Sequence, residues 1–192
     1  MTTARLDTFS DGVLAIILTI MVLKLKIPES GELAALEELV PVLISYMLSF
    51  IYIGIYWNNH HHLMHGTDKI DGGVMWANLH LLFWLSLIPF VTGWMGENNF
   101  TKTTVAAYGV VLLNSAIAYW ILMSKIIRLN GKDSELAMAL GKNIKGKISP
   151  LLYVLGIALS FWHAWAAGIV YVIVAFMWLI PEKKIEENSN ID

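Results

Sequence analysis

The sequence contains no cysteine, and charged side chains make up only 15% of its 192 residues. The absence of cysteine excludes a disulfide framework, thiolate zinc sites and a cysteine nucleophile. Soluble domains carry about 25% charged residues, so the shortage of charge argues against a soluble globular enzyme. The formal net charge of −2 offers no basic field for nucleic acid, which is not expected as a partner.

The sequence also lacks the short motifs of common catalytic sites and ion filters. It has no HExxH metal motif, no Walker or Rossmann glycine loop, no GxSxG nucleophile elbow and no TVGYG filter loop. Apolar residues are abundant instead, at 57% of the chain, and the mean hydropathy is +0.62. The apolar runs are long and continuous, which favours helices over the short alternating strands of a membrane barrel. We predict an all-α polytopic membrane protein.

Apolar runs of spanning length recur along the chain, and a spanning helix needs about 20 residues. The last run, Ile148–Ile180, is too long for one span, and we divide it at His163, whose polar ring suits a turn at the interface. Pro89 is expected to kink the third span, and Gly156 and Gly168 to allow close helix approach. We predict one membrane domain over 1–181 and a cytoplasmic tail at 182–192. The membrane domain has six predicted spans per subunit, at 5–27, 38–60, 74–95, 103–127, 148–162 and 164–180.

The distribution of Lys and Arg predicts the orientation in the membrane. With six spans both termini lie on one side, and that side holds ten of the thirteen basic residues. Because short cytoplasmic loops carry an excess of Lys and Arg, both termini are predicted to be cytoplasmic. The other side holds Lys24, Lys26 and Lys102.

The first span begins with polar residues, Arg5 to Gly12 reading RLDTFSDG. One interpretation is an interfacial helix start, in which Asp7 and Asp11 favour the helix dipole and Arg5 stays in water. The other places Ser10 and Asp11 inside the bundle, where they bind polar groups on neighbouring helices. Candidate partners are Trp57 and His60 at the end of the second span and Asn78 in the third.

A run of histidines follows the second span, at His60, His61, His62 and His65. The simplest interpretation is that the last three decorate a cytoplasmic loop. His61 and His65 are four residues apart, so they share a helix face and could bind a metal. No cysteine or acidic cluster on the same helix supports such a site, so none is predicted as the main function.

The first span carries an apolar stripe at helical spacing. At 100° per residue, Ile16, Ile20 and Leu23 fall within about 60° of one another. Such a stripe faces lipid, packs in a core or lines a pore that gates by dewetting. Thr19 flanks the stripe and could offer a hydroxyl to an ion.

Residues 5–11 carry the pattern RxxxFSD. This pattern resembles the signature of the potassium channels called transmembrane protein 175, known from lysosomes and prokaryotes. Trp57-x-x-His60 resembles the end of that family's second helix, and Asn78 followed by Pro89 resembles its third helix. The resemblance covers most of the chain and is strongest over 5–95.

The resemblance implies a potassium-permeable cation channel in which helix 1 of each subunit lines a central pore. Animal members carry two six-helix repeats and dimerise, so this chain, similar to one repeat, is expected to form a homotetramer. The hydrophobic constriction of the family corresponds to Ile16, and a second lining position to Leu23. Thr19 and Ile20 correspond to the positions between them.

The resemblance also implies a polar network that ties the first three helices together. Its members here are Arg5, Phe9, Ser10, Asp11, Trp57, His60 and Asn78. Lys24 and Lys26, near the external mouth of the pore, depart from the pattern of the family. Positive charge there would oppose the passage of K+. We therefore expect that they do not both face the axis.

The sequence thus predicts a K+ channel in the lipid bilayer of a prokaryotic plasma membrane, with no cofactor beyond permeant K+ and other monovalent cations. Two alternatives stay open. One is a small histidine-dependent membrane metal transporter or enzyme, and the other is a non-conducting structural membrane subunit.

Overall fold

The computed structural model describes residues 2–67, 69–131 and 144–179, and the predicted tail at 182–192 lies outside them. Every regular element in these residues is a helix, so the predicted all-α fold is confirmed for this part of the chain. The helices are α1 (Thr3–Leu23), α2 (Ala34–Glu37), α3 (Val40–His65), α4 (Gly72–Ser86), α5 (Ile88–Glu97), α6 (Lys102–Asn130), α8 (Ile144–Ser160) and α9 (Ala164–Leu179).

Four stretches of helix are long and apolar enough to cross a membrane. They are α1, α3, the pair α4 and α5 taken together as Gly72–Glu97, and α6. α9 is apolar but has only 16 residues, and α8 has 17. The chain turns between these last two helices at residues 161–163.

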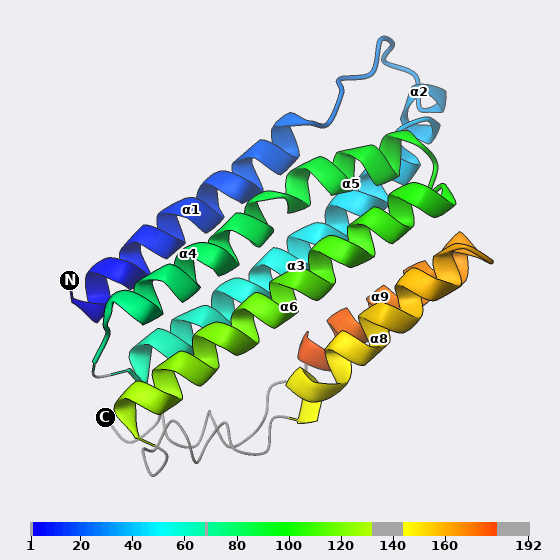
Figure 1. Cartoon of the computed structure of the whole chain (residues 1–192). Coiled ribbons are helices and arrows are strands. Elements are labelled where there is room, and N and C mark those ends of the chain that lie inside the picture. The colour runs from blue at the N-terminus through cyan, green and yellow to red at the C-terminus, as the bar shows by residue number, and fades with distance from the viewer. Residues whose placement is uncertain (1, 68, 132–143, 180–192) are drawn as a thin grey trace.

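The long helices lie side by side, with α1 at one edge and the α8–α9 hairpin at the opposite edge (Figure 1). α1 packs against α3, α4 and α5, whereas α6 packs against α4, α5, α8 and α9. Each helix satisfies its backbone hydrogen bonds internally, as a bilayer requires. Among the described residues, α1 is covered along one side.

The third predicted span is interrupted where α4 ends at Ser86 and α5 begins at Ile88. Pro89 lies in the first turn of α5. Proline has no backbone N–H to donate, and its ring clashes with the carbonyl four residues earlier. The kink expected at Pro89 therefore takes the form of a break after the preceding helix, with the two pieces following one another along the bundle (Figure 1).

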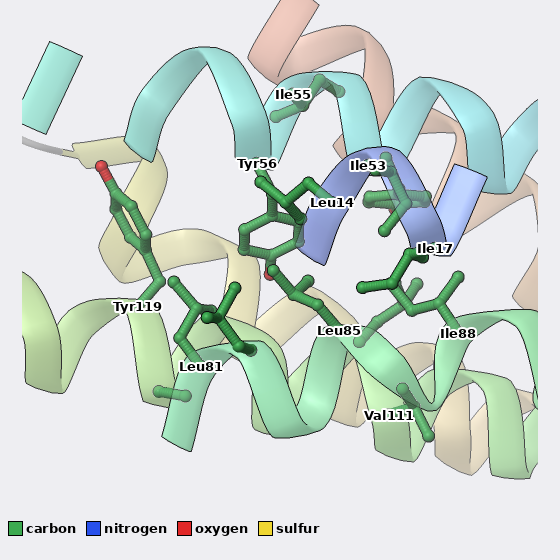
Figure 2. Packing of buried hydrophobic residues seen from close by; sticks show 14 of the residues in the cluster. Leu14, Ile17, Ile53, Ile55, Tyr56, Leu81, Leu85, Ile88, Val111 and Tyr119 are labelled. Atoms are coloured by element: carbon green, nitrogen blue, oxygen red, sulfur yellow. The ribbon is translucent and has the colours of Figure 1, made fainter. Parts of the chain in front are cut away.

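Aliphatic side chains from four helices form the core between α1 and the rest of the bundle. Leu14 and Ile17 of α1 lie close to Ile53 of α3 and to Leu85 and Ile88 of the α4–α5 pair (Figure 2). All five are at most 3% exposed. Dense packing of this kind holds α1 by dispersion contacts along its whole buried side.

The α8–α9 hairpin packs on α6 through glycine. A Cβ atom added at Gly109 of α6 or Gly156 of α8 would collide with the ring of Tyr171 on α9. The expectation of close approach is therefore confirmed for Gly156. It is wrong for Gly168, because nothing in the described part of the chain lies within 4 Å of a Cβ built there.

We expect Gly156→Ala to lower the free energy of unfolding by about 1–3 kcal/mol, because the methyl group must displace the buried ring of Tyr171. The measurement is the thermal unfolding of purified protein in detergent. Gly168→Ala is the matched control and should change the midpoint little. Equal midpoints for the two variants would contradict the packing described here.

Candidate pore helix and its polar network

α1 is held by one face. Its buried residues follow one another at intervals of three or four positions, which places them on one side of a helix. They pack against α3, α4 and α5. The buried set consists of Leu6, Ser10, Leu14, Ile17 and Met21.

The opposite face of α1 is uncovered in the chain. Ile16 is 60% exposed and Leu23 is 75% exposed, whereas the adjacent Ile17 is 3% exposed. Phe9 and Ile20 are also exposed. All four lining positions suggested by the sequence, Ile16, Thr19, Ile20 and Leu23, therefore lie on exposed sides of α1.

The hydroxyl of Thr19 donates to the carbonyl of Ala15, at 2.9 Å. This bond lies within α1 and uses only the hydroxyl proton. The oxygen lone pairs of Thr19 stay available to water or a cation on the exposed side.

A chain of buried hydrogen bonds links three helices at the N-terminal end of α1. Asn78 Nδ2 of α4 donates to Ser10 Oγ of α1 at 2.9 Å. His60 Nε2 of α3 lies 2.7 Å from Asn78 Oδ1. Ser10 Oγ in turn donates to the carbonyl of Leu6 at 2.9 Å. The three side chains are 0–1% exposed, so no bulk water competes for these bonds.

The direction of each bond follows from the chemistry of the amide. Asn78 donates through Nδ2, and its Oδ1 can only accept. His60 Nε2 must therefore carry a proton and donate to it. Leaving one of these buried groups unpaired costs about 1–3 kcal/mol, so the three residues fix one arrangement of α1, α3 and α4.

A second contact joins α1 to α3 nearer the surface. The indole Nε1 of Trp57 donates to Asp11 Oδ1 at 2.9 Å. Trp57 is 46% exposed. This bond to a carboxylate is charge-assisted, and it supplements the buried chain at the next residue of α1.

Two residues that the sequence analysis did not place in the network lie beside it. Asp7 of α1 reaches His60 and His61 of α3, with Oδ1 3.6 Å from His60 Nδ1 and Oδ2 3.6 Å from His61 Nδ1. The signal in the sequence was the spacing of Asp7 and Asp11, which puts both carboxylates on one side of α1. The adjacency of two histidines at the end of α3 was the complementary signal.

Arg5 and Phe9 take no part in these hydrogen bonds. Both are exposed, and Phe9 is 48% exposed on the uncovered side of α1. The structure thus brings together five of the seven residues suggested for the network, namely Ser10, Asp11, Trp57, His60 and Asn78.

The fold and the site define a helical membrane protein whose first helix is tied to the bundle by polar bonds on one side and is bare on the other. The family described as endosomal/lysosomal potassium channel TMEM175 matches residues 5–89. A potassium channel of Chryseobacterium sp. (strain P1-3) is 53% identical over 98% of both chains. The chain therefore belongs to the TMEM175 family, as its RxxxFSD pattern predicted.

More distant relatives have the same description. A potassium channel of Streptomyces collinus is 29% identical over 82% of both chains. The crystal structure of a lysosomal potassium-selective channel TMEM175 homolog from Chamaesiphon minutus matches with a TM-score of 0.80 and 27% identity, covering 92% of this chain and 96% of that one. The family consists of ion channels in membranes, so the protein is an integral membrane protein and not an enzyme.

We expect Asn78→Ala to lower the thermal unfolding midpoint strongly. The variant leaves the buried Nε2–H of His60 without its acceptor, which lowers the free energy of unfolding by about 1–3 kcal/mol. Asn114→Ala is the matched control, since among the described residues Asn114 Nδ2 donates to the carbonyl of Val110 in its own helix. Thermal unfolding in detergent followed by tryptophan fluorescence compares the two. A midpoint for Asn78→Ala no lower than that of Asn114→Ala would contradict the importance of the buried chain.

Proposed function

We propose that four copies of this chain assemble with α1 around a central axis and form a potassium-permeable channel. The observation that carries the proposal is the exposed apolar face of α1. The other face of this helix is buried against the bundle. Potassium is the ion because the relatives at 53%, 29% and 27% identity are named potassium channels. Six spanning helices per subunit complete the assembly, with α8 and α9 as the two short ones.

Ile16 forms the constriction in this proposal. A ring of four isoleucine side chains excludes water when it is narrow and so closes the pore by dewetting. The ring offers no ligand that could replace the water around K+. Conduction therefore keeps the ion largely hydrated or widens the ring on opening.

Selectivity comes from the width of the ring and from hydroxyl oxygens near it. Thr19 lies three residues beyond Ile16, and Leu23 about 10 Å beyond Ile16 along the helix. The lone pairs of Thr19 supply polar contacts between the two apolar positions. Because so few ligands line this path, the preference for K+ over Na+ is modest.

The polar network sets which face of α1 meets the axis. One residue of shift along a helix rotates its side chains by 100°. A shift that moved Ile16 to the place of Ile17 would bury it and would remove Ser10 from Asn78, so the bonds of Ser10 and Asp11 oppose it. The network thus acts on the pore by orienting α1.

The groove beside α1 supports contact between subunits. Ile16 and Ile20 line it from α1, and Phe90 and Trp94 line it from α5. Phe90 is 65% exposed. In the proposed assembly a neighbouring copy packs into this groove, which is lined from both helices.

Both termini face the cytoplasm in this proposal, in the plasma membrane of a prokaryote, and α1 ends at the external mouth. There Lys26 Nζ lies 3.5 Å from Glu97 Oε1 of the α5 helix. The pairing directs the Lys26 charge toward its own subunit. The pairing thereby reduces the expected repulsion between the two lysines and permeating cations. The proposed channel uses no cofactor beyond permeant K+.

The test of conduction is ion flux through purified protein in liposomes, first under a K+ gradient and then under a Na+ gradient. Flux that favours K+ supports the channel. An absence of flux for either ion, with the tetramer intact, would favour a non-conducting structural subunit instead.

We expect Ile16→Asn to raise K+ flux about tenfold, which corresponds to a barrier lower by about 1.4 kcal/mol, because the amide wets the ring. The ratio of K+ to Na+ flux should fall toward unity. The matched control is Ile169→Asn, an equally exposed isoleucine (61%) on α9 at the far edge of the bundle. Unchanged flux and selectivity in Ile16→Asn would remove Ile16 from the constriction.

Assembly around α1 can be tested separately, because the sequence contains no cysteine. We expect Leu23→Cys to give covalent dimers on gels after treatment with a short bis-maleimide, since neighbouring copies of α1 meet at the axis. Ile169→Cys on α9 should remain monomeric under the same conditions. Equal crosslinking at both positions would contradict the proposed arrangement.

A further inference from the structure

A group of potential metal ligands lies at the N-terminal end of α1, outside the apolar face that the channel proposal uses. Asp7 from α1 and His61 and His65 from α3 each offer one ligand atom, and these atoms all lie within 4.8 Å of one another. Asp7 Oδ2 is 3.6 Å from His61 Nδ1, and the rings of His61 and His65 have their centroids 4.5 Å apart. The ligands come from two helices that meet here.

Polar atoms at this place lack hydrogen-bond partners. Asp7 Oδ1, His60 Nδ1 and His61 Nδ1 are buried and make no hydrogen bond with the described residues. The His60 side chain is only 1% exposed, and its Nδ1 faces Asp7 Oδ1 at 3.6 Å. Since His60 Nε2 donates to Asn78, a neutral His60 presents a lone pair to the carboxylate. The site is therefore rich in acceptors and short of positive charge.

We propose that Asp7, His61 and His65 bind a divalent transition metal of the Zn²⁺ type, with water as the fourth ligand. Two imidazole nitrogens and one carboxylate oxygen suit Zn²⁺, whereas Mg²⁺ and Ca²⁺ prefer oxygen ligands alone. Bonds of about 2.0–2.1 Å in a tetrahedron put the ligand atoms about 3.4 Å from one another. The pair from Asp7 and His61 already has nearly this separation, so most of the adjustment falls on His65.

The geometry allows that adjustment and gives the metal a route in. His65 is exposed and is the last residue of α3, directly before Gly66. The side chain of His61 is 38% exposed, and that of Asp7 is 15% exposed. An exposed terminal histidine can close onto an ion that Asp7 and His61 have already engaged.

Occupation of the site would clamp α1 to α3 one turn before Asp11. Metal binding is therefore expected to hold the N-terminal end of α1 in place and to lower K+ flux. This consequence rests on the proposed function, whereas metal binding itself does not.

Binding is tested on the full-length protein in detergent, without an affinity tag and stripped with a chelator. Equilibrium dialysis against Zn²⁺ should give about one ion per chain, and Co²⁺ should give the intense visible absorption of a tetrahedral site. We expect His61→Ala and His65→Ala each to weaken binding at least tenfold. His62→Ala is the matched control, because His62 lies in the same run outside the ligand group, and it should bind as the unaltered protein does.

No uptake of Zn²⁺ by the unaltered protein would overturn the proposal. Retention of full affinity in the double variant His61→Ala, His65→Ala would also overturn it, as would displacement of Zn²⁺ by equimolar Mg²⁺. A thermal unfolding midpoint close to that of His62→Ala shows that each variant is folded, so loss of binding then supports the site.

The flux arm separates this proposal from the channel proposal. Zn²⁺ on the cytoplasmic side should reduce K+ flux through liposomes containing the unaltered protein and have little effect on His65→Ala. Zn²⁺ binding with no flux under any condition would leave the site standing and contradict the channel. Flux that Zn²⁺ binding does not alter would overturn the clamp.

Discussion

The arrangement of this protein depends on one constraint, which is that a polar side chain placed inside a bilayer must find its partner within the protein. Ser10 on α1 donates to the carbonyl of Leu6 and accepts from Asn78 of α4, and Asn78 accepts in turn from His60 of α3. The three residues come from three different helices, and Ser10 lies 68 positions before Asn78. Their bonds define how the first three spans fit together.

The same bonds decide what α1 presents to its surroundings. A helix that is locked along Ser10 must turn its opposite side outward, and that side carries Ile16 and Leu23. The stability of the bundle and the lining of the proposed pore are therefore two consequences of a single helix rotation. The core contacts of Leu14 and Ile17 reinforce that rotation (Figure 2).

The N-terminal end of α1 carries two acidic residues. Asp7 and Asp11 extend from α1 toward α3. Trp57 lies opposite Asp11, and the imidazoles of His60 and His61 lie opposite Asp7. Asp11 Oδ1 accepts a hydrogen bond from Trp57 Nε1. Asp7 Oδ1 accepts none from the described residues, although it faces His60 Nδ1. This difference within one turn separates a structural contact from a place suited to a cation.

The helical class and the apolar stripe could be predicted from the chain, because they depend on local composition and on a period of 3.6 residues. The family could be predicted from the RxxxFSD pattern, which is read directly from the residues. The folded bundle was needed to show that Asp7, and not Arg5, reaches the histidines, and that Gly156, and not Gly168, makes room for a ring. Those outcomes depend on the register and rotation of one helix against another. Packing of many distant side chains sets that register, and no local pattern encodes it.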